Sequence, residues 1–132
     1  MIKLYNIFES LILEGVNAQN VNDAIERKVW VNIDYSGDEH FAAGKRTIEV
    51  YSYGLSLGDN PVIGAYQIHG TSTNDSSSSG VPGWKLFRLD RITKWEATKF
   101  KFRKPISDRA NVPTFNPSGH KKMKTLYNIV KF

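Results

Sequence analysis

The strongest constraint on the fold is a strand-like run that carries charge, residues 83–92 with the sequence GWKLFRLDRI. Large apolar residues mix with basic ones in this run, and Gly83 and the Asp90-Arg91 pair bound it, as in a strand with one side in water. Arg88 lies inside the otherwise apolar pattern. A charge in such a place needs a partner or a ligand, so the run predicts a β fold in which arginine has a defined role.

Four further segments have the composition and spacing of strands. Residues 29–35 alternate Val, Val, Ile and Tyr with Trp, Asn and Asp, and residues 45–53 and 62–69 are preceded by turn-forming residues. The remaining strand, residues 93–103, comes directly after the charged run. The serine-rich stretch 71–80 is polar and has no periodicity, so it is predicted to be a mobile loop.

Helices are predicted at both ends of the chain. Residues 4–14 place apolar side chains at helical spacing. A short second helix is expected over residues 21–28, with Asn20 or Asn22 as its cap. Residues 116–130 start with Asn-Pro-Ser and then place Met, Leu, Tyr and Val at helical spacing beside three lysines, which predicts a short C-terminal helix.

These elements predict one domain of mainly β structure, in the α+β class: a small five-stranded barrel with N-terminal helices and a C-terminal helix. The 132 residues suffice for one hydrophobic core. We divide the chain into an N-terminal helical segment (1–28), the barrel (29–104) and a basic tail with a short helix (105–132).

Composition excludes several classes of site and location. The chain has no cysteine, so a disulfide framework, a thiolate zinc site and a cysteine nucleophile are all excluded. No apolar run approaches the length that spans a membrane, and the N-terminus lacks the pattern of a secretion signal. We therefore expect a soluble, cytoplasmic protein with no membrane partner.

Charge is distributed unevenly along the chain. Residues 1–80 contain 5 Lys and Arg against 10 Asp and Glu, a net charge of −5, whereas residues 81–132 contain 13 against 3, a net charge of +10. A basic half of this size attracts polyanions because binding releases their counterions. The alternative is a lysine-rich surface that faces only water.

Three segments of the strand region form one pattern: Arg46 with Glu49-Val50-Tyr51, then Ala65-Tyr66-Gln67, then Phe87-Arg88-Leu89-Asp90-Arg91-Ile92. Over residues 29–104 this pattern resembles the signature of WYL domains, which are named for a Trp-Tyr-Leu triplet. The triplet position here keeps only Tyr66, whereas the last segment matches in full. The resemblance implies an SH3-like or Sm-like barrel that senses nucleic acid or nucleotide-like ligands. The family's usual helix-turn-helix does not precede the barrel, so the protein would act alone, as a homo-oligomer, or on a partner.

Arg46, Arg88 and Arg91 are the candidate anion-binding residues. Arginine is always charged, and its planar fork suits phosphate, so three arginines on neighbouring strands could form one pocket. The alternative is that carboxylates such as Asp34, Glu49 or Asp90 pair with them at the barrel rim. For Asp90 and Arg91 the alternative also includes a purely structural turn.

Aromatic residues could offer flat faces on which bases stack. The candidates are Tyr51, Tyr66 and Trp84, with Tyr53 beside them on its strand, and His69, at the end of its strand, could help to line the pocket. The alternatives are that these aromatic residues belong to the core of a small barrel and that His69 is a hydrogen-bonded surface residue. Tyr51 shares a face of its strand with Glu49, and that face is expected to be half exposed.

Motifs for catalysis are weak. Residues 54–58 (GLSLG) match the Gly-x-Ser-x-Gly elbow of hydrolases, but a strand and no helix follows them, so a hairpin loop is the better interpretation. His40, His69 and His120 share no metal-ligand spacing with carboxylates, and no glycine-rich string carries the lysine of a phosphate loop. We expect no enzymatic activity, no metal and no cofactor.

The sequence thus supports a regulatory, non-enzymatic module that binds single-stranded DNA or RNA, or a nucleotide-like anion. The rival hypothesis is a structural or virion-associated interaction protein that uses the barrel as a scaffold. Its support is the predicted N-terminal helix, a docking or targeting segment whose end, residues 11–15, is similar to short segments of some tailed-phage head proteins that are cleaved after Leu-x-Glu.

Overall fold

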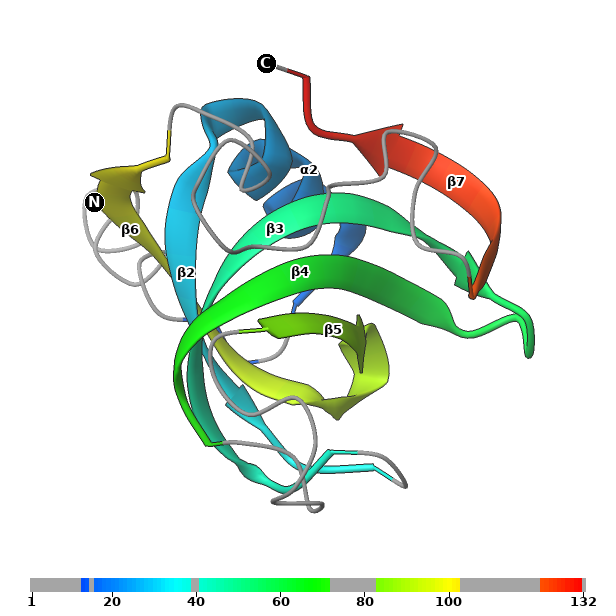
Figure 1. Ribbon diagram of the computed structural model, residues 1–132, viewed down its shortest axis with the longest axis horizontal. Helices are drawn as coiled ribbons and strands as arrows, with labels where there is room; N and C mark the ends of the chain where they lie inside the picture. The colour runs from blue at the N-terminus through cyan, green and yellow to red at the C-terminus, as the bar shows by residue number, and fades with distance from the viewer. Residues whose placement is uncertain (1–12, 15, 39–40, 72–82, 103–121, 132) are drawn as a thin grey trace, which may run out of the picture.

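The computed structural model describes residues 13–14, 16–38, 41–71, 83–102 and 122–131 (Figure 1). The described chain is mainly β, with one α-helix and one 3₁₀ turn. In chain order its elements are β1 (Leu13–Glu14), α2 (Ala18–Arg27), β2 (Val29–Tyr35), β3 (Gly44–Ser56), β4 (Pro61–Gly70), β5 (Gly83–Arg88), η1 (Leu89–Arg91), β6 (Ile92–Lys101) and β7 (Met123–Ile129). The five strands predicted in the central region are confirmed.

The strands form one antiparallel sheet in the order β1-β6-β2-β3-β4-β5, and β7 pairs with β3. The long strand β3 pairs with β2 through its first half and with β7 through its second half, while β4 runs along its other edge. Figure 1 shows β3 and β4 as long, strongly curved ribbons. The pairings among the described strands do not close the sheet.

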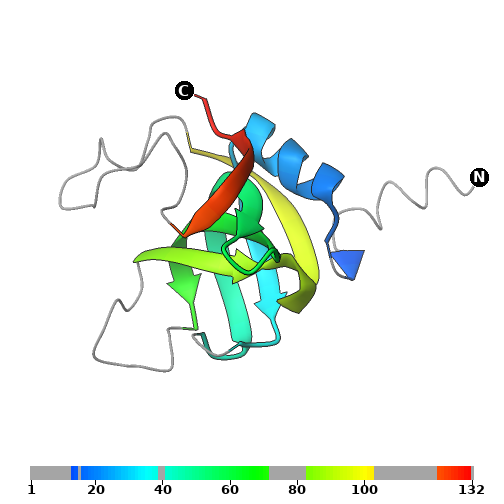
Figure 2. The same ribbon diagram turned by 90° about the vertical axis from the view of Figure 1, so that its right-hand side faces the viewer.

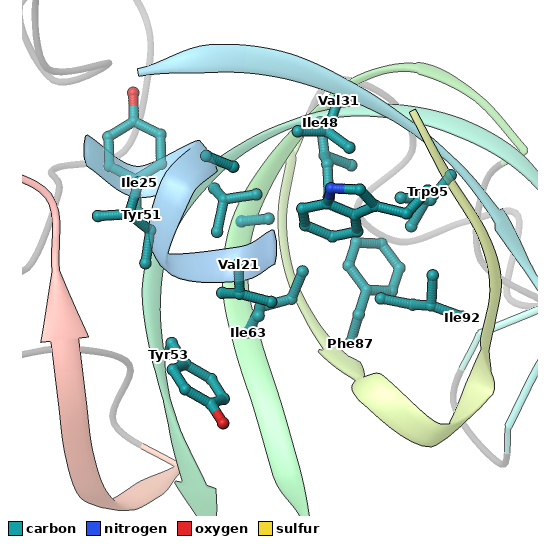
Figure 3. Close-up of a cluster of buried hydrophobic side chains, with 14 of the residues drawn as sticks. Val21, Ile25, Val31, Ile48, Tyr51, Tyr53, Ile63, Phe87, Ile92 and Trp95 are labelled. Carbon is teal, nitrogen blue, oxygen red and sulfur yellow. The ribbon is translucent and has the colours of Figure 1, made fainter. Parts of the chain in front are cut away.

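The apolar pattern of the strands decides which side of the sheet faces inward. In β2, Val29, Val31, Ile33 and Tyr35 are buried and alternate with half-buried polar or aromatic residues, as predicted. Figure 3 shows how side chains from different strands meet on this inner face. Its buried cluster includes Val31 from β2, Ile48 from β3, Ile63 from β4, Phe87 from β5, and Ile92 and Trp95 from β6.

The helix α2 lies beside β7 and against β3 at one end of the molecule (Figures 1 and 2). Val21, Ala24 and Ile25 form its buried face. Its cap is Asn17, not the predicted Asn20 or Asn22, because Asn17 accepts a hydrogen bond from the Asn20 backbone while the Asn20 side chain accepts one from Asn17. No described helix has the length and apolar character needed to cross a membrane.

Two of the helix predictions are wrong where the structure describes them. Leu13 and Glu14, the predicted end of the first helix, form β1 and pair with Trp95 and Lys94 of β6; residues 4–12 lie outside the described residues. Residues 123–129, predicted as the C-terminal helix, form β7. The second half of β3 extends beyond β2, and β7 satisfies the backbone groups along that edge.

The hairpin predicted for residues 54–58 is confirmed. These residues end β3 and enter the turn to β4, in which Asp59 adopts a positive φ of 66°. Gly54 lies where β7 approaches closely, since a Cβ atom there would lie 1.9 Å from the carbonyl oxygen of Thr125. This approach explains the glycine without any catalytic role. The serine-rich stretch lies, except for Thr71, outside the described residues.

Candidate anion-binding site

Arg46 is buried, and only 2% of its surface is exposed to solvent. Its Nη1 donates a hydrogen bond to Gln67 Oε1 at 2.9 Å, and its Nη2 donates to the carbonyl oxygen of Ala42. Its Nε has no hydrogen-bond acceptor among the described residues. The guanidinium carbon lies 5.3–5.9 Å from three ring centroids, those of Phe87, Tyr35 and Phe41. Aromatic faces therefore surround this charge.

Lys85 brings a second buried positive charge to the same place. It lies on β5, on the same face as Phe87, and is 1% exposed. Its Nζ lies 5.5 Å from the centroid of the Phe41 ring, which also faces Arg46. Burial, and then the charge of Arg46, lower the pKa of Lys85. Burial also lowers the pKa of Arg46, against the effects of Tyr35 and Asp38.

Two cations buried near one another reduce stability unless something negative compensates them. Lys85 is not among the residues predicted for the site, although the sequence contains a signal for it. Lys85, Phe87 and Leu89 follow one another at a spacing of two residues in an apolar strand. That spacing places the lysine on the buried face.

The carboxylate beside this pair belongs to Asp38, in the turn between β2 and β3. Its Oδ2 accepts a hydrogen bond from the Tyr35 hydroxyl at 2.5 Å, and its Oδ1 accepts one from the Phe41 backbone N–H at 2.7 Å. Burial, and then the bond to Asp38, raise the pKa of Tyr35, which keeps this hydroxyl a neutral donor. The negative charge of Asp38 also counters the fall in the pKa of Arg46. The turn lies at the end of the molecule opposite α2 (Figure 1).

Arg88 lies next to this cluster but directs its side chain to a carboxylate. Its backbone N–H donates to the Tyr35 hydroxyl oxygen at 3.0 Å. Its guanidinium donates two hydrogen bonds to Asp90, at 3.0 and 2.6 Å, and these bonds are the main cause that raises its pKa. The alternative interpretation of Arg88, pairing with Asp90, is therefore confirmed.

Arg91 lies on the solvent side of the turn between β2 and β3. It is exposed and lines a surface cavity of about 520 Å³ together with residues 36–38 and 41–43. All three predicted arginines therefore lie near the turn between β2 and β3. Arg46 donates to the Ala42 carbonyl oxygen from the buried side, the Arg88 backbone N–H donates to the Tyr35 hydroxyl, and Arg91 lines the cavity on the solvent side.

The predicted aromatic residues gather elsewhere, around Glu49. This carboxylate is fully buried and accepts hydrogen bonds from Trp30 Nε1 and from the Tyr51 hydroxyl, each at 2.9 Å. Trp84 contacts the rings of both Tyr51 and Tyr66, at centroid distances of 5.0 and 5.2 Å.

Tyr51 and Tyr66 are 1% and 5% exposed, so neither offers an open face to a base. Burial supports the alternative that they belong to the core, and the expectation that the face of Glu49 is half exposed is wrong for Glu49 and Tyr51. Glu49 and Arg46 are three residues apart in a stretch that pairs regularly with β2, so their side chains lie on opposite faces of β3.

His69 is exposed and lies at the end of a polar row across the sheet, where it pairs with Thr47. The row continues through Thr47, Asn32 and Glu96, in which Thr47 donates to Asn32 at 2.7 Å and Asn32 donates to Glu96 at 3.0 Å. A groove of about 470 Å³ passes over this row, and Lys45, Arg46 and Lys94 also line it. Its polar groups largely bond to one another, so we do not place the anion site here.

The described residues contain no group of three or more His, Cys, Asp or Glu side chains that could hold a metal ion. In comparisons with known proteins, no family model, no curated protein and no solved structure matches the chain.

Proposed function

We propose that this protein is a non-enzymatic ligand-binding module of the WYL kind, in which the cationic cluster around Asp38 binds a nucleotide-like anion or single-stranded nucleic acid. The observation that carries the proposal is the burial of Arg46 and Lys85 together, at 2% and 1% exposure. Buried charge is costly, and a binding role for anions accounts for its presence. Arg91 lies at the cavity beside the same turn and would meet an approaching phosphate first.

The proposal includes an SH3-like or Sm-like barrel. The strands β5 and β6 lie near opposite ends of the strand order, yet the three-residue turn η1 connects them directly. So short a connection requires the sheet to curl until its ends lie near one another. Such curling supports a barrel whose interior ends at the cluster of Arg46 and Lys85.

A second candidate is the scaffold or interaction protein. Large apolar side chains that are exposed favour it, because such side chains in groups mark protein contacts. Leu57, Phe100 and Tyr127 are 68%, 68% and 55% exposed. They come from different elements, so no single exposed apolar patch supports the scaffold proposal as directly as the buried cations support ligand binding. The predicted N-terminal docking or targeting segment lies mostly outside the described residues.

Binding to short labelled single-stranded DNA and RNA, followed by fluorescence anisotropy at several salt concentrations, tests the proposal. We expect affinity to fall steeply as salt rises, and Arg91→Ala to weaken binding and to flatten the slope of log K against log salt by about 0.7 for each phosphate that the variant no longer neutralises. Lys131→Ala is the matched control, because Lys131 is also exposed and lies beyond β7. Equal reductions of affinity in the two variants, or no binding by the wild type at low salt, would contradict the proposal.

A further inference from the structure

An exposed aromatic pair lies on the outer face of the sheet, where β6 runs beside β2 (Figure 1). Phe100 is 68% exposed, and its ring centroid lies 6.1 Å from that of the half-buried Trp30. Trp30 Nε1 donates to Glu49 at 2.9 Å, which holds the indole in place. The hydrophobic core therefore accounts for Trp30 in part and does not account for Phe100.

A bulge in β6 places Phe100 beside Trp30. Over residues 97–101 β6 advances four positions, while its partner β2 advances only two over residues 29–31, so β6 has two extra residues here. Thr98 Oγ1 donates to the Trp30 carbonyl oxygen at 2.8 Å and accepts from the Phe100 backbone N–H at 3.2 Å, which stabilises the bulge. Bulges re-aim side chains. The exposed position of Phe100 is thus a built feature of the strand.

The next row on this face is polar and consists of Glu96, Asn32 and Thr47. Thr47 donates to Asn32 Oδ1, and Asn32 Nδ2 donates to Glu96 Oε1. Among the described residues, these bonds leave the second amide hydrogen of Asn32 and the Oε2 atom of Glu96 without a partner. Both residues line the groove of about 470 Å³. The row therefore offers a ligand one donor and one acceptor side by side.

A hydroxyl group satisfies such a pair, because it donates one hydrogen bond and accepts another. The Glu96 carboxylate only accepts hydrogen bonds and repels phosphate, so it favours a hydroxyl over an anion. In nucleic acid the ribose 2′-hydroxyl has this dual character, and DNA lacks it. Asn32 lies two residues along β2 from Trp30, a distance of about 7 Å, so the row is close enough to the aromatic pair for one nucleotide to contact both.

We propose that this face binds a ribonucleotide of single-stranded RNA, with its base stacked on Phe100 and its 2′-hydroxyl held by Glu96 and Asn32. The proposal rests on the proposed function, for which it selects RNA over DNA. It uses a face of β2 and β6 that is separate from the cationic cluster.

The order of the rows along β2 connects this face with the cationic cluster. Beyond Asn32 the next row contains Asp34 with its partners Lys45 and Lys94, and both lysines are exposed. The strand β2 then ends at the turn whose cavity Arg91 lines. An RNA strand that follows β2 therefore runs from the stacking face toward the proposed anion site.

The test compares RNA and DNA oligonucleotides of identical sequence, built from A and C only, so that the 2′-hydroxyl is the only difference. Fluorescence anisotropy on the full chain should show RNA binding at least about tenfold more tightly, because DNA leaves the carboxylate without a donor. RNA with 2′-O-methyl groups keeps the oxygen and loses the donor, so it should bind as DNA does. Maltoheptaose, which carries hydroxyls without bases or phosphates, should not compete with RNA.

Glu96→Ala tests the 2′-hydroxyl contact. RNA should bind more weakly and DNA slightly more tightly, since the variant loses the acceptor and a negative charge, so the ratio of the two affinities should fall close to one. Glu26→Ala is the matched control, because it removes the same charge from an exposed position on α2. This control should leave the ratio unchanged.

Phe100→Ala tests the stacking contact. RNA and DNA should both bind about fivefold or more weakly, because stacking does not depend on the sugar. Leu57→Ala is the matched control, since Leu57 is also 68% exposed and lies in the hairpin between β3 and β4. It should leave both affinities unchanged.

The outcomes separate the two proposals. Equal binding of RNA and DNA by the wild type, which needs no variant, refutes the ribonucleotide site while the proposed function stands. A preference for RNA that survives Glu96→Ala, or affinities that survive Phe100→Ala, also refutes it. Competition by maltoheptaose would mean that the face binds a saccharide. If neither strand binds at low salt, both proposals fail.

Discussion

The strand β3 carries a buried charge on each of its faces, and the two charges differ in their hydrogen-bond partners. Glu49 is a buried anion with ordinary hydrogen-bond partners: it receives a donor from Trp30 and another from Tyr51. Arg46 is a buried cation beside a second buried cation, Lys85, and its Nε has no acceptor in the described ranges. The first arrangement stabilises the fold. The second places two cations near one another, and the charge of Asp38 acts on Arg46.

This contrast separates structural from functional burial of charge. A buried polar group whose hydrogen bonds are made within the protein fixes one packing arrangement. Buried groups that repel one another are costly, and such groups concentrate at binding sites. We therefore assign the face of Glu49 to the core and propose that the face of Arg46 binds the ligand, whereas the predicted pocket combines residues of both faces.

The largest expected effect follows from removing the buried anion. Glu49→Ala leaves the Trp30 and Tyr51 donors without their carboxylate, and we expect the free energy of unfolding to fall by about 2–4 kcal/mol. Urea denaturation measures the change. Glu49→Gln, which keeps an acceptor oxygen, should lose less. A Glu49→Ala protein that keeps its stability but loses ligand binding would reverse the assignment of the two faces.

The opposite result is expected at the cation. Arg46→Met replaces the charge with an apolar side chain of similar length among aromatic rings, while Gln67 Oε1 loses its donor. Because the two effects oppose each other, we expect stability to change by no more than about 1 kcal/mol. Binding to single-stranded nucleic acid should disappear in the same protein. Arg46→Lys, which keeps the charge but not the planar fork, should bind weakly. If Arg46→Met strongly destabilised the fold and binding survived in the folded fraction, Arg46 would be as structural as Glu49.

The sequence predicts the central strands well because their signals are local. Alternation in residues 29–35 and the turn after residue 56 need no distant partner to be recognised. The segment 123–129 shows the limit. Met123, Leu126, Tyr127 and Val130 suit a helix, yet Met123, Thr125, Tyr127 and Ile129 equally suit a strand. The free edge of β3 decides between them, and that edge exists only in the folded protein.

The sequence predicts the arginines of the candidate site but not its carboxylate, Asp38. Arg46, Arg88 and Arg91 were identified because charge in apolar strands is conspicuous. Asp38 lies in a turn, where aspartate is common and gives no signal. The aromatic residues were misplaced for another reason. Both faces of β3 are buried between Ile48 and Gly54. A sequence does not reveal which face of such a strand a ligand can reach.

The smallest expected effect concerns pH and uses Lys85. Its pKa in the folded protein is lowered below the ordinary 10.5 by burial and by Arg46. Between that lowered pKa and 10.5 the unfolded chain binds more protons at this position than the folded chain, so the contribution of Lys85 to stability rises as pH rises. Below this window both states are protonated and the contribution is constant.

Lys85→Met removes this dependence. The difference in unfolding free energy between Lys85→Met and wild type, measured by urea denaturation from neutral pH to about 10.5, should therefore shrink with rising pH, because wild type loses its buried charge. Tyr35 acts in the opposite direction, since its raised pKa makes the folded state lose stability above about 10. Because Tyr35 is present in both proteins, it cancels in the difference to first order. A difference that stays constant over the whole range would mean that Lys85 carries no burial cost, and the contrast between the two faces of β3 would then depend on Arg46 alone.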